Sequence, residues 1–227
     1  MANFTNEAEV LKAARYYPEN DIMANRKYYL LAKKTMDILG AIAGILLCFP
    51  LLLVIAILIK WEDPKGSVFF KQIRLGKNGK PFYMYKFRSM VANSEELLQQ
   101  LLSQNEMNGA MFKMKDDPRV TRIGKFIRKT SIDEMPQLWN VLKGEMSLVG
   151  PRPPLPREVE SYTSYDRQRL LVTPGCTGLW QVSGRNGLSF KQMVELDLAY
   201  IRQRSIWLDM KLILKTVWII VFPNNAY

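Results

Sequence analysis

The strongest constraint in this sequence is an uncharged, apolar run of 22 residues from Ile38 to Ile59. At a rise of about 1.5 Å per residue, a helix of this length is roughly long enough to cross the hydrocarbon core of a bilayer. The preceding segment, Met1–Lys34, is polar and rich in charge, which is not the pattern of a secretory signal peptide. The run therefore indicates a membrane segment.

Pro50 lies near the centre of this run, and its effect on the helix bears on which of two membrane topologies the run adopts. Proline removes one backbone donor and clashes with the carbonyl of Leu46, four positions earlier. Both flanks are basic, and positive residues favour the cytoplasmic side of a membrane. A re-entrant helical hairpin over residues 36–60 therefore fits better than a single transmembrane helix, which stays open as the alternative. The basic residues are Arg26, Lys27, Lys33 and Lys34 before the run, and Lys60, Lys65, Lys71 and Arg74 after it.

Charge and the missing residue types narrow the chemistry. Lys and Arg number 32 against 21 acidic residues, a formal net charge of +11, which favours anionic partners such as phosphorylated substrates, an acidic membrane surface or nucleic acid. The sequence contains no histidine, which excludes Ser–His–Asp and Cys–His nucleophile systems and histidine metal sites. Its two cysteines, Cys48 and Cys176, form no metal-binding or disulfide pattern. An enzyme of this composition depends on carboxylates, Lys, Arg, hydroxyls and a carboxylate-bound metal.

The remaining sequence predicts a mostly helical α+β fold in a single membrane-associated domain. We expect an N-terminal helical extension over residues 1–35, the membrane hairpin over 36–60, and a cytoplasmic catalytic domain with interfacial helices over 61–227. Two β-rich runs flank a Gly76–Lys77–Asn78–Gly79 turn and predict a small β-hairpin over 68–90. Further helices are expected over residues 94–107, 132–143, 155–171 and 190–203.

Trp207–Phe222 predicts one more helix, with tryptophans near both ends. Asp209 and Lys211 contribute to a polar side, and the rest of the segment is strongly apolar. This pattern is typical of a helix that lies at a membrane interface. It is equally compatible with an ordinary core helix.

The densest group of chemistry-bearing residues lies between Arg119 and Pro153, where cations surround Asp133 and Glu134 near the start of a predicted helix. Neighbouring cations and a helix N-terminus keep a carboxylate ionised near neutral pH. An ionised Asp133 among phosphate-binding cations could attack phosphorus, and Glu134 could bind a hard cation such as Mg²⁺. The cations are Arg122, Lys125, Arg128 and Lys129, followed by Arg152 between two prolines.

The same residues also have a purely structural interpretation. Ser131-x-x-Glu134 matches a capping box, and acids in a first helical turn are favoured by the helix dipole. Lys86, Arg128 and Arg152 are, on this interpretation, solvated surface charges. Both interpretations stay open at the level of residue patterns.

Three ordered segments resemble the bacterial sugar transferases, the monotopic polyprenyl-phosphate phosphoglycosyl transferases. They are KFRSM at Lys86–Met90, RKTSIDEMPQLWNVLKGEMSLVGPRP at Arg128–Pro153 and PGCTGLWQVSGRN at Pro174–Asn186. The likeness covers roughly Tyr29–Val221. It resembles most the undecaprenyl-phosphate hexose-1-phosphate transferases, and it implies a chain without the N-terminal multi-span domain of larger relatives. Phe49 departs from the family pattern, in which a serine immediately precedes the proline. The hydroxyl of that serine would help to satisfy the freed backbone groups.

The resemblance implies a role for each matching residue. Asp133 matches the nucleophilic aspartate, and Glu134 matches the glutamate associated with Mg²⁺, so both are expected to be catalytic and Glu134 to be the metal ligand. Pro50 matches the proline that breaks the re-entrant membrane helix. The basic residues expected to bind the phosphates and the nucleotide are Lys86, Arg128 and Arg152.

The activity implied is transfer of a hexose-1-phosphate from a UDP-sugar to polyprenyl phosphate through an aspartyl-phosphosugar, releasing UMP and initiating bacterial glycan or exopolysaccharide assembly. Mg²⁺ is the expected cofactor. The expected partners are both substrates, membrane lipids and a second copy in a homodimer, at the cytoplasmic face of the bacterial inner membrane. A nucleic-acid partner is not expected, because no binding motif appears. A non-catalytic membrane-anchored scaffold and an N-acetylated UDP-hexosamine donor stay open as alternatives.

Overall fold

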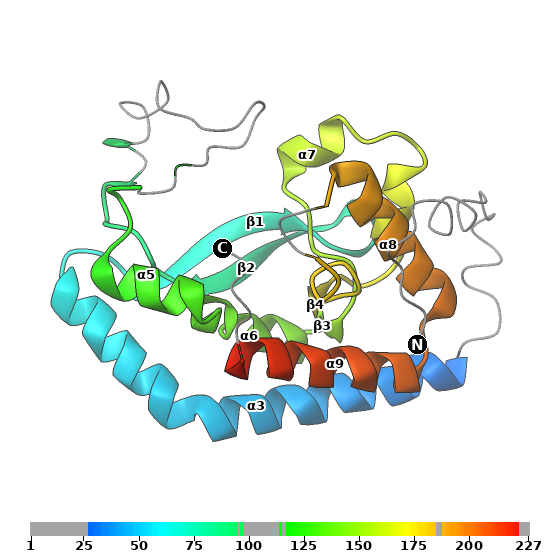
Figure 1. Cartoon of the computed structure of the whole chain (residues 1–227), viewed down its shortest axis with the longest axis horizontal. Helices are drawn as coiled ribbons and strands as arrows, with labels where there is room; N and C mark the ends of the chain where they lie inside the picture. The colour runs from blue at the N-terminus through cyan, green and yellow to red at the C-terminus, as the bar shows by residue number, and fades with distance from the viewer. Residues whose placement is uncertain (1–26, 95, 98–113, 115–116, 185–187, 223–227) are drawn as a thin grey trace. The chain divides into compact units, whose positions relative to one another are not determined.

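The computed structural model describes residues 27–94, 96–97, 114, 117–184 and 188–222 (Figure 1). Contacts divide the chain into two compact units. Unit 1 combines Met1–Gly44, Gln72–Met84 and Gln137–Tyr227, and unit 2 combines Ile45–Lys71 and Tyr85–Pro136. The fold is mostly helical with two small sheets, which confirms the predicted α+β class.

The apolar run lies in a long helix, α3 (Lys27–Glu62), which passes from unit 1 into unit 2. Within the described residues it is the one helix long and apolar enough to cross a membrane. The predicted re-entrant hairpin is not seen, because the helix continues through Pro50. One proline removes a single helical hydrogen bond, and the leucine-rich turns on both sides favour helix strongly.

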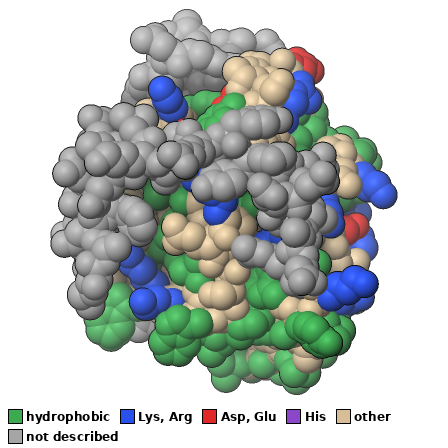
Figure 2. Space-filling view, turned by 90° about the vertical axis from the view of Figure 1, so that its right-hand side faces the viewer, with side chains coloured by type: hydrophobic (Ala, Val, Ile, Leu, Met, Phe, Trp, Pro, Cys, Tyr) green, Lys and Arg blue, Asp and Glu red, His purple; other side chains and the backbone are tan. Residues whose placement is uncertain are grey.

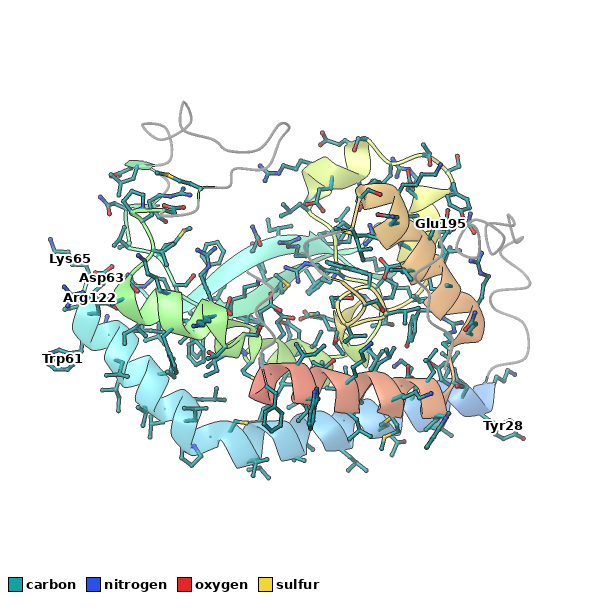
Figure 3. The ribbon with its side chains drawn as sticks, viewed as in Figure 1. Tyr28, Trp61, Asp63, Lys65, Arg122 and Glu195 are labelled. Carbon is teal, nitrogen blue, oxygen red and sulfur yellow. The ribbon has the colours of Figure 1, made fainter. Side chains whose placement is uncertain are left out.

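Aromatic and apolar side chains cover much of the outside of α3. Tyr28 near its start and Trp61 near its end point away from the helix (Figure 3). Between them, Leu46 and Leu47 are also exposed, Leu47 to 84%. A helix this exposed and this apolar lacks the burial that would stabilise it in water, so it requires an apolar environment.

The predicted β-hairpin is confirmed. Strand β1 (Phe69–Leu75) pairs with β2 (Pro81–Phe87) across the short 3₁₀ turn η1 (Lys77–Gly79). The Gly76 N–H donates to the Lys80 carbonyl at 2.8 Å, and Asn78 and Gly79 have positive φ. These are residue types that tolerate the left-handed region, which is why the turn was readable from sequence.

Unit 2 is built around α5 (Arg122–Lys129) and the following 3₁₀ turn η3 (Ile132–Glu134). Its apolar core contains Ile55, Ile59, Phe87 and Ile127. Gly124 is required within α5, because a Cβ there would collide with the carbonyl oxygen of Ser89. This close backbone approach seats α5 against the segment that follows β2.

The N-terminus of α5 is capped by the C-terminal end of α3. The Glu62 carboxylate accepts from the backbone N–H groups of Arg122 and Ile123, at 2.7 and 3.0 Å. Thr121 adds its own side-chain cap to Gly124 N. Figure 3 shows Arg122 beside Asp63, the residue after α3. These caps satisfy backbone donors that the first helical turn leaves unpaired.

Unit 1 contains the second sheet and most of the shorter helices. Strands β3 (Ser147–Val149) and β4 (Gly175–Thr177) pair in parallel, with Ser147 opposite Gly175 and Val149 opposite Thr177. Gly175 packs so closely on the Gly150 backbone that a Cβ could not be placed there. The helices are α6 (Gln137–Leu142), α7 (Pro156–Glu160), the 3₁₀ helix η4 (Asp166–Leu171), α8 (Phe190–Gln203) and α9 (Ile206–Val221).

Helix α8 forms the centre of unit 1, and α9 lies at its surface. Residues 194–201 of α8 are all buried, whereas α9 exposes Trp207, Leu214, Val217 and Trp218. In Figure 1, α9 lies alongside the first part of α3. The space-filling view, which shows the right-hand side of Figure 1, has hydrophobic side chains gathered along its lower edge (Figure 2). The exposed apolar side of α9 agrees with the expected interfacial helix.

The predicted helices are confirmed in part. Residues 190–203 form α8 as expected. The expected helix over 132–143 is instead a 3₁₀ turn and the short α6, interrupted around Pro136, and the one over 155–171 is divided into α7 and η4. Most of 94–107, and residues 1–26 of the expected N-terminal extension, lie outside the described residues.

Candidate active site

The two candidate catalytic acids lie on the 3₁₀ turn η3, directly after α5. Helix α5 ends at Lys129, and Ser131 then adopts a left-handed conformation with φ 57° and ψ 15°. This reversal leads into Asp133 and Glu134, both half-buried. The capping box considered for Ser131 is wrong, since its side chain makes no cap hydrogen bond. The acids are therefore presented by a strained turn and not by a regular helix start.

Glu134 is held by Lys86 of β2. The Lys86 Nζ lies 2.7 Å from Glu134 Oε1, in an ion pair whose side chains are 17% and 28% exposed. Forty-eight residues separate the two in sequence. The structure thus brings together the KFR and IDE segments, which were assigned to one site from sequence.

Arg128 acts electrostatically on Asp117, another acid of unit 2. Asp117 accepts a bidentate ion pair from Arg119, with Nη2 to Oδ2 at 2.6 Å. The pKa of the Asp117 carboxyl is lowered, mainly by the Arg119 hydrogen bond and to a smaller degree by the charge of Arg128. Arg128 itself, at the end of α5, is exposed, so its guanidinium is accessible to a dissolved anion.

Four of the five predicted site residues belong to unit 2, namely Lys86, Arg128, Asp133 and Glu134. Arg152 belongs to unit 1, in the loop after β3, half-buried between the buried Pro151 and Pro153. Its expected contact with the substrate stays a prediction.

The carboxylates of η3 could hold Mg²⁺ only if water and substrate phosphates supply the remaining ligands. Among the described residues, no group of three or more Asp, Glu, His or Cys side chains could hold a metal ion. Mg²⁺ usually binds through one or two carboxylates and completes its coordination with water and substrate phosphates. Asp133 and Glu134 are the two carboxylates expected in this role, and Glu134 is paired with Lys86 in this structure.

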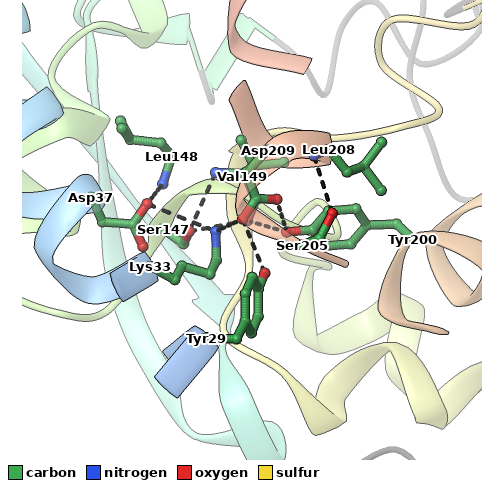
Figure 4. Close-up of polar contacts among 10 residues, drawn as sticks. All are labelled: Tyr29, Lys33, Asp37, Ser147, Leu148, Val149, Tyr200, Ser205, Leu208 and Asp209. Carbon is green, nitrogen blue, oxygen red and sulfur yellow. Dashed lines mark hydrogen bonds and ion pairs between the residues drawn. The ribbon is translucent and has the colours of Figure 1, made fainter. Parts of the chain in front are cut away.

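Sequence reasoning missed a buried polar network in unit 1, centred on Asp209 (Figure 4). Asp209 is fully buried and was expected on the polar side of α9, an assignment that the structure corrects. Its Oδ2 accepts from Tyr29 Oη at 3.0 Å and from Lys33 Nζ at 3.1 Å, and its Oδ1 lies 2.7 Å from Tyr200 Oη. A buried acid among the apolar residues of α9 requires such partners. This requirement was the sequence signal that could have revealed the network.

The network extends from the start of α3 to β3. Lys33 also lies 3.8 Å from Asp37, whose Oδ1 accepts from the backbone N–H of Leu148 at 3.0 Å. Burial and the charge of Asp209 raise the pKa of Tyr200 well above its ordinary value, so its hydroxyl remains a donor. These contacts join α3, α8, α9 and β3 within unit 1.

A second buried ion pair lies in unit 1. Arg169 of η4 donates to Asp197 of α8, with Nη2 to Oδ2 at 2.6 Å and Nε to Oδ2 at 2.8 Å. Arg169 also donates to Tyr162 Oη at 2.9 Å. Burial raises the pKa of the Asp197 carboxyl to about 6, although Arg169 opposes the shift.

Comparison with known proteins shows which family the chain resembles. The sequence profile of the bacterial sugar transferases matches residues 28–223. A galactosyl transferase, CpsE, from Streptococcus agalactiae serotype III is 50% identical over 87% of this chain and 44% of its own length. A UDP-galactose-lipid carrier transferase from Erwinia amylovora is 40% identical over 99% of this chain and 46% of its own length.

A relative of similar length also matches. The exopolysaccharide production protein ExoY of Rhizobium meliloti is 41% identical, over 87% of this chain and 88% of its own length. The chain spans less than half the length of CpsE and of the Erwinia transferase. The matched region nevertheless includes α3, both sheets, η3 and α9. This chain therefore belongs to the bacterial sugar transferase family.

Proposed function

We propose that this chain transfers a hexose-1-phosphate from a UDP-hexose to undecaprenyl phosphate, the step that initiates assembly of a bacterial exopolysaccharide or related glycan. The observation that carries the proposal is the turn η3, where Asp133 adjoins a glutamate held by Lys86 at 2.7 Å. Membership of the bacterial sugar transferase family supports the same assignment.

In the first step, an Asp133 carboxylate oxygen attacks the sugar-proximal phosphorus of the UDP-sugar. A bond forms between that oxygen and phosphorus, and the bond from phosphorus to the bridging oxygen breaks. UMP leaves with the bridging oxygen, and the phosphosugar stays on Asp133. The role of Lys86 and Arg128 is to offset negative charge as it spreads over the phosphoryl oxygens, the main requirement of phosphoryl transfer.

In the second step, a phosphate oxygen of undecaprenyl phosphate attacks the same phosphorus. The bond between phosphorus and the Asp133 oxygen breaks, which regenerates the carboxylate and releases undecaprenyl-diphosphate-hexose. The protein contributes position, because a carboxylate held beside an interface meets a lipid phosphate at high effective concentration.

We propose that Glu134, together with Asp133, holds Mg²⁺ once a substrate phosphate is present to complete its coordination. The metal supplies positive charge to the phosphoryl oxygens when bound there. Glu134 is paired with Lys86 in this structure, which keeps the Lys86 ammonium beside the residue that would hold the metal.

We further propose that α3 enters the membrane from the cytoplasmic face and returns to it, bending at Pro50 without ending the helix. The basic residues on both sides of Ile38–Ile59 support this topology, as does the exposure of Leu46 and Leu47. The exposed face of α9 then lies at the headgroup level. The site is assigned to the inner membrane of a bacterium, where its lipid substrate resides.

Galactose and glucose are the hexoses to test first. The names of the relatives from Streptococcus agalactiae and Erwinia amylovora specify galactose. A Xanthomonas campestris relative, 38% identical, is named a UDP-glucose:undecaprenyl-phosphate glucose-1-phosphate transferase. An Aeromonas hydrophila relative, 43% identical, is named for N-acetylgalactosamine, which keeps the hexosamine as a second candidate.

The test is UMP release by the purified chain in detergent, with UDP-galactose, UDP-glucose or UDP-N-acetylgalactosamine and undecaprenyl phosphate. Asp133→Asn is expected to slow release at least about a hundredfold, because the amide cannot act as the nucleophile. Glu160→Gln, an exposed carboxylate of α7, is the matched control and should keep the wild-type rate.

The covalent step has its own readout. With UDP-sugar and no lipid acceptor, intact mass spectrometry should find wild-type protein heavier by one hexose phosphate, and the Asp133→Asn protein unchanged. Release of UMP by Asp133→Asn at the wild-type rate would exclude Asp133 as the nucleophile.

A further inference from the structure

Unit 1 contains a cavity of about 410 Å³ whose lining residues all belong to that unit. It is bordered by the start of α3, the turn between α6 and β3, the loop before β4 and the end of α8. Its volume lies in the range typical of small-molecule sites. Asp133 and Glu134 belong to unit 2 and do not line it.

The lining of the cavity is strongly cationic. Five basic side chains contribute to it, and Asp37 is the one acidic residue among the described lining residues. The basic residues are Lys33, Lys34, Lys77, Lys143 and Arg204.

The nearby acids neutralise only part of this charge. Asp37 and Asp209 both pair with Lys33, and Glu145 pairs with Lys143 at 2.6 Å. Lys34 and Lys77 form no ion pair with any residue that the structure describes. Uncompensated cations around one hollow attract an anion, because the low-dielectric walls focus their field.

Arg204 adds a preorganised cation to the same lining. It is 7% exposed, and its guanidinium lies 5.9 Å from the centre of the Tyr29 ring. Such a stacked guanidinium keeps its charge and loses little freedom when it binds an anion.

We propose that this cavity binds the phosphate group of an anionic ligand. A phosphate matches several converging cations better than a single carboxylate does, because it presents more acceptor oxygens and up to twice the charge. Ile38, the first residue of the uncharged run, also lines the cavity. A ligand with an apolar part in a bilayer could therefore place its phosphate here, as could a dissolved phosphate. The proposal does not depend on the proposed reaction.

The experiment uses the full chain in neutral detergent micelles at low ionic strength and compares two probes. Inorganic phosphate is titrated by calorimetry, and phosphatidylglycerol is scored by native mass spectrometry against phosphatidylcholine. The test variant is Lys34→Gln/Lys77→Gln. The control, Lys80→Gln/Lys191→Gln, removes the same charge from exposed residues of unit 1 that do not line the cavity.

The cavity variant is expected to bind at least one probe at least about tenfold more weakly than the control, since each lost ammonium removes a charge-assisted contact. A loss with both probes assigns the site to phosphate as such, and a loss with phosphatidylglycerol alone assigns it to lipid headgroups. Asp133→Asn should retain the binding, which separates this cavity from the proposed catalytic turn. Equal affinity in both lysine variants, or no binding of either probe, would overturn the proposal.

Discussion

Lys86 Nζ lies 2.7 Å from Glu134 Oε1, so a residue of β2 in the KFRSM segment holds an acid of the η3 turn. The contact fixes one of two carboxylates that adjoin each other in sequence. Because both side chains remain partly exposed, at 17% and 28%, solvent screens the pair and limits what it contributes to folding. The pair is accordingly better suited to organising anionic ligands than to stabilising unit 2.

A double-mutant cycle on Lys86 and Glu134 separates these two contributions. We expect Lys86→Gln and Glu134→Gln each to slow UMP release at least about tenfold, with a coupling in unfolding free energy of about 1 kcal/mol or less. Glu134→Gln should also lose most of the Mg²⁺ dependence of the rate. Lys80→Gln and Glu160→Gln serve as exposed controls. Wild-type turnover in both single variants, or an unchanged metal titration for Glu134→Gln, would contradict the assignment.

Ser131 provides a test of strain at the proposed catalytic turn. Its φ of 57° is costly for a residue with a Cβ and free of that cost for glycine. Ser131→Gly should therefore raise the free energy of unfolding by up to about 1 kcal/mol, and Ser131→Val should lower it by at least as much. Ser164 is an exposed turn residue without positive φ, so Ser164→Gly should lower the free energy of unfolding. Denaturant unfolding in detergent measures all three, and a destabilised Ser131→Gly would exclude strain here.

Local patterns predicted the parts of the fold that local physics determines. The hairpin of β1 and β2 follows from alternating β-formers around Asn78–Gly79. Helix α8 begins at Ser189, whose side chain and Gln192 form a capping box. The contact between Lys86 and Glu134 joins two segments that the family resemblance, and not their spacing, had assigned to one site.

Non-local contacts account for what the sequence did not reveal. Strands β3 and β4 span three residues each, too few for a periodic signal, and their parallel pairing depends on segments far apart in the chain. The burial of Asp209 depends on partners contributed by α3 and α8. The left-handed Ser131 follows from the packing of α5 against η3, where a capping serine was the natural expectation.

The network around Asp209 should dominate the stability of unit 1. Asp209→Leu removes the acceptor for Tyr29, Lys33 and Tyr200 and leaves Lys33 nearly buried, at 12% side-chain exposure. We expect a loss of about 3–5 kcal/mol in unfolding free energy, against about 1–2 kcal/mol for Tyr200→Phe. Lys211→Gln, an exposed neighbour on α9, should have little effect. Equal stability of the Asp209 and Lys211 variants would show the network to be unimportant.

The raised pKa of Asp197 predicts that the free energy of unfolding depends on pH. Burial raises the pKa of its carboxyl from 3.8 to about 6 in the folded chain, so the folded state binds more protons than the unfolded state between those values. The contribution of this group to stability therefore falls as the pH rises from about 3.8 to about 6, by about 3 kcal/mol in all. Its contribution is constant above that window.

Comparison with Asp197→Asn isolates this group, since every other titration cancels. Denaturant unfolding at a series of pH values should find the wild type losing stability relative to Asp197→Asn through the window, with parallel curves above it. Glu160→Gln, whose side chain is exposed, should give a curve parallel to the wild type throughout. Parallel curves for Asp197→Asn across the window would contradict the raised pKa.

The topology of α3 is open to a direct measurement. In a background without Cys48 and Cys176, single cysteines at Ala32 and Ser67, both exposed and on opposite flanks of the apolar run, can be labelled with a membrane-impermeant maleimide. If α3 re-enters, both react in inverted vesicles and neither reacts in intact spheroplasts. Pro50→Leu restores a helical hydrogen bond and removes the proposed bend, so we expect one flank to become reactive from the opposite side. A span in the wild type, with the two cysteines on different sides, would refute the re-entrant topology and leave the assignment of the catalytic turn unaffected.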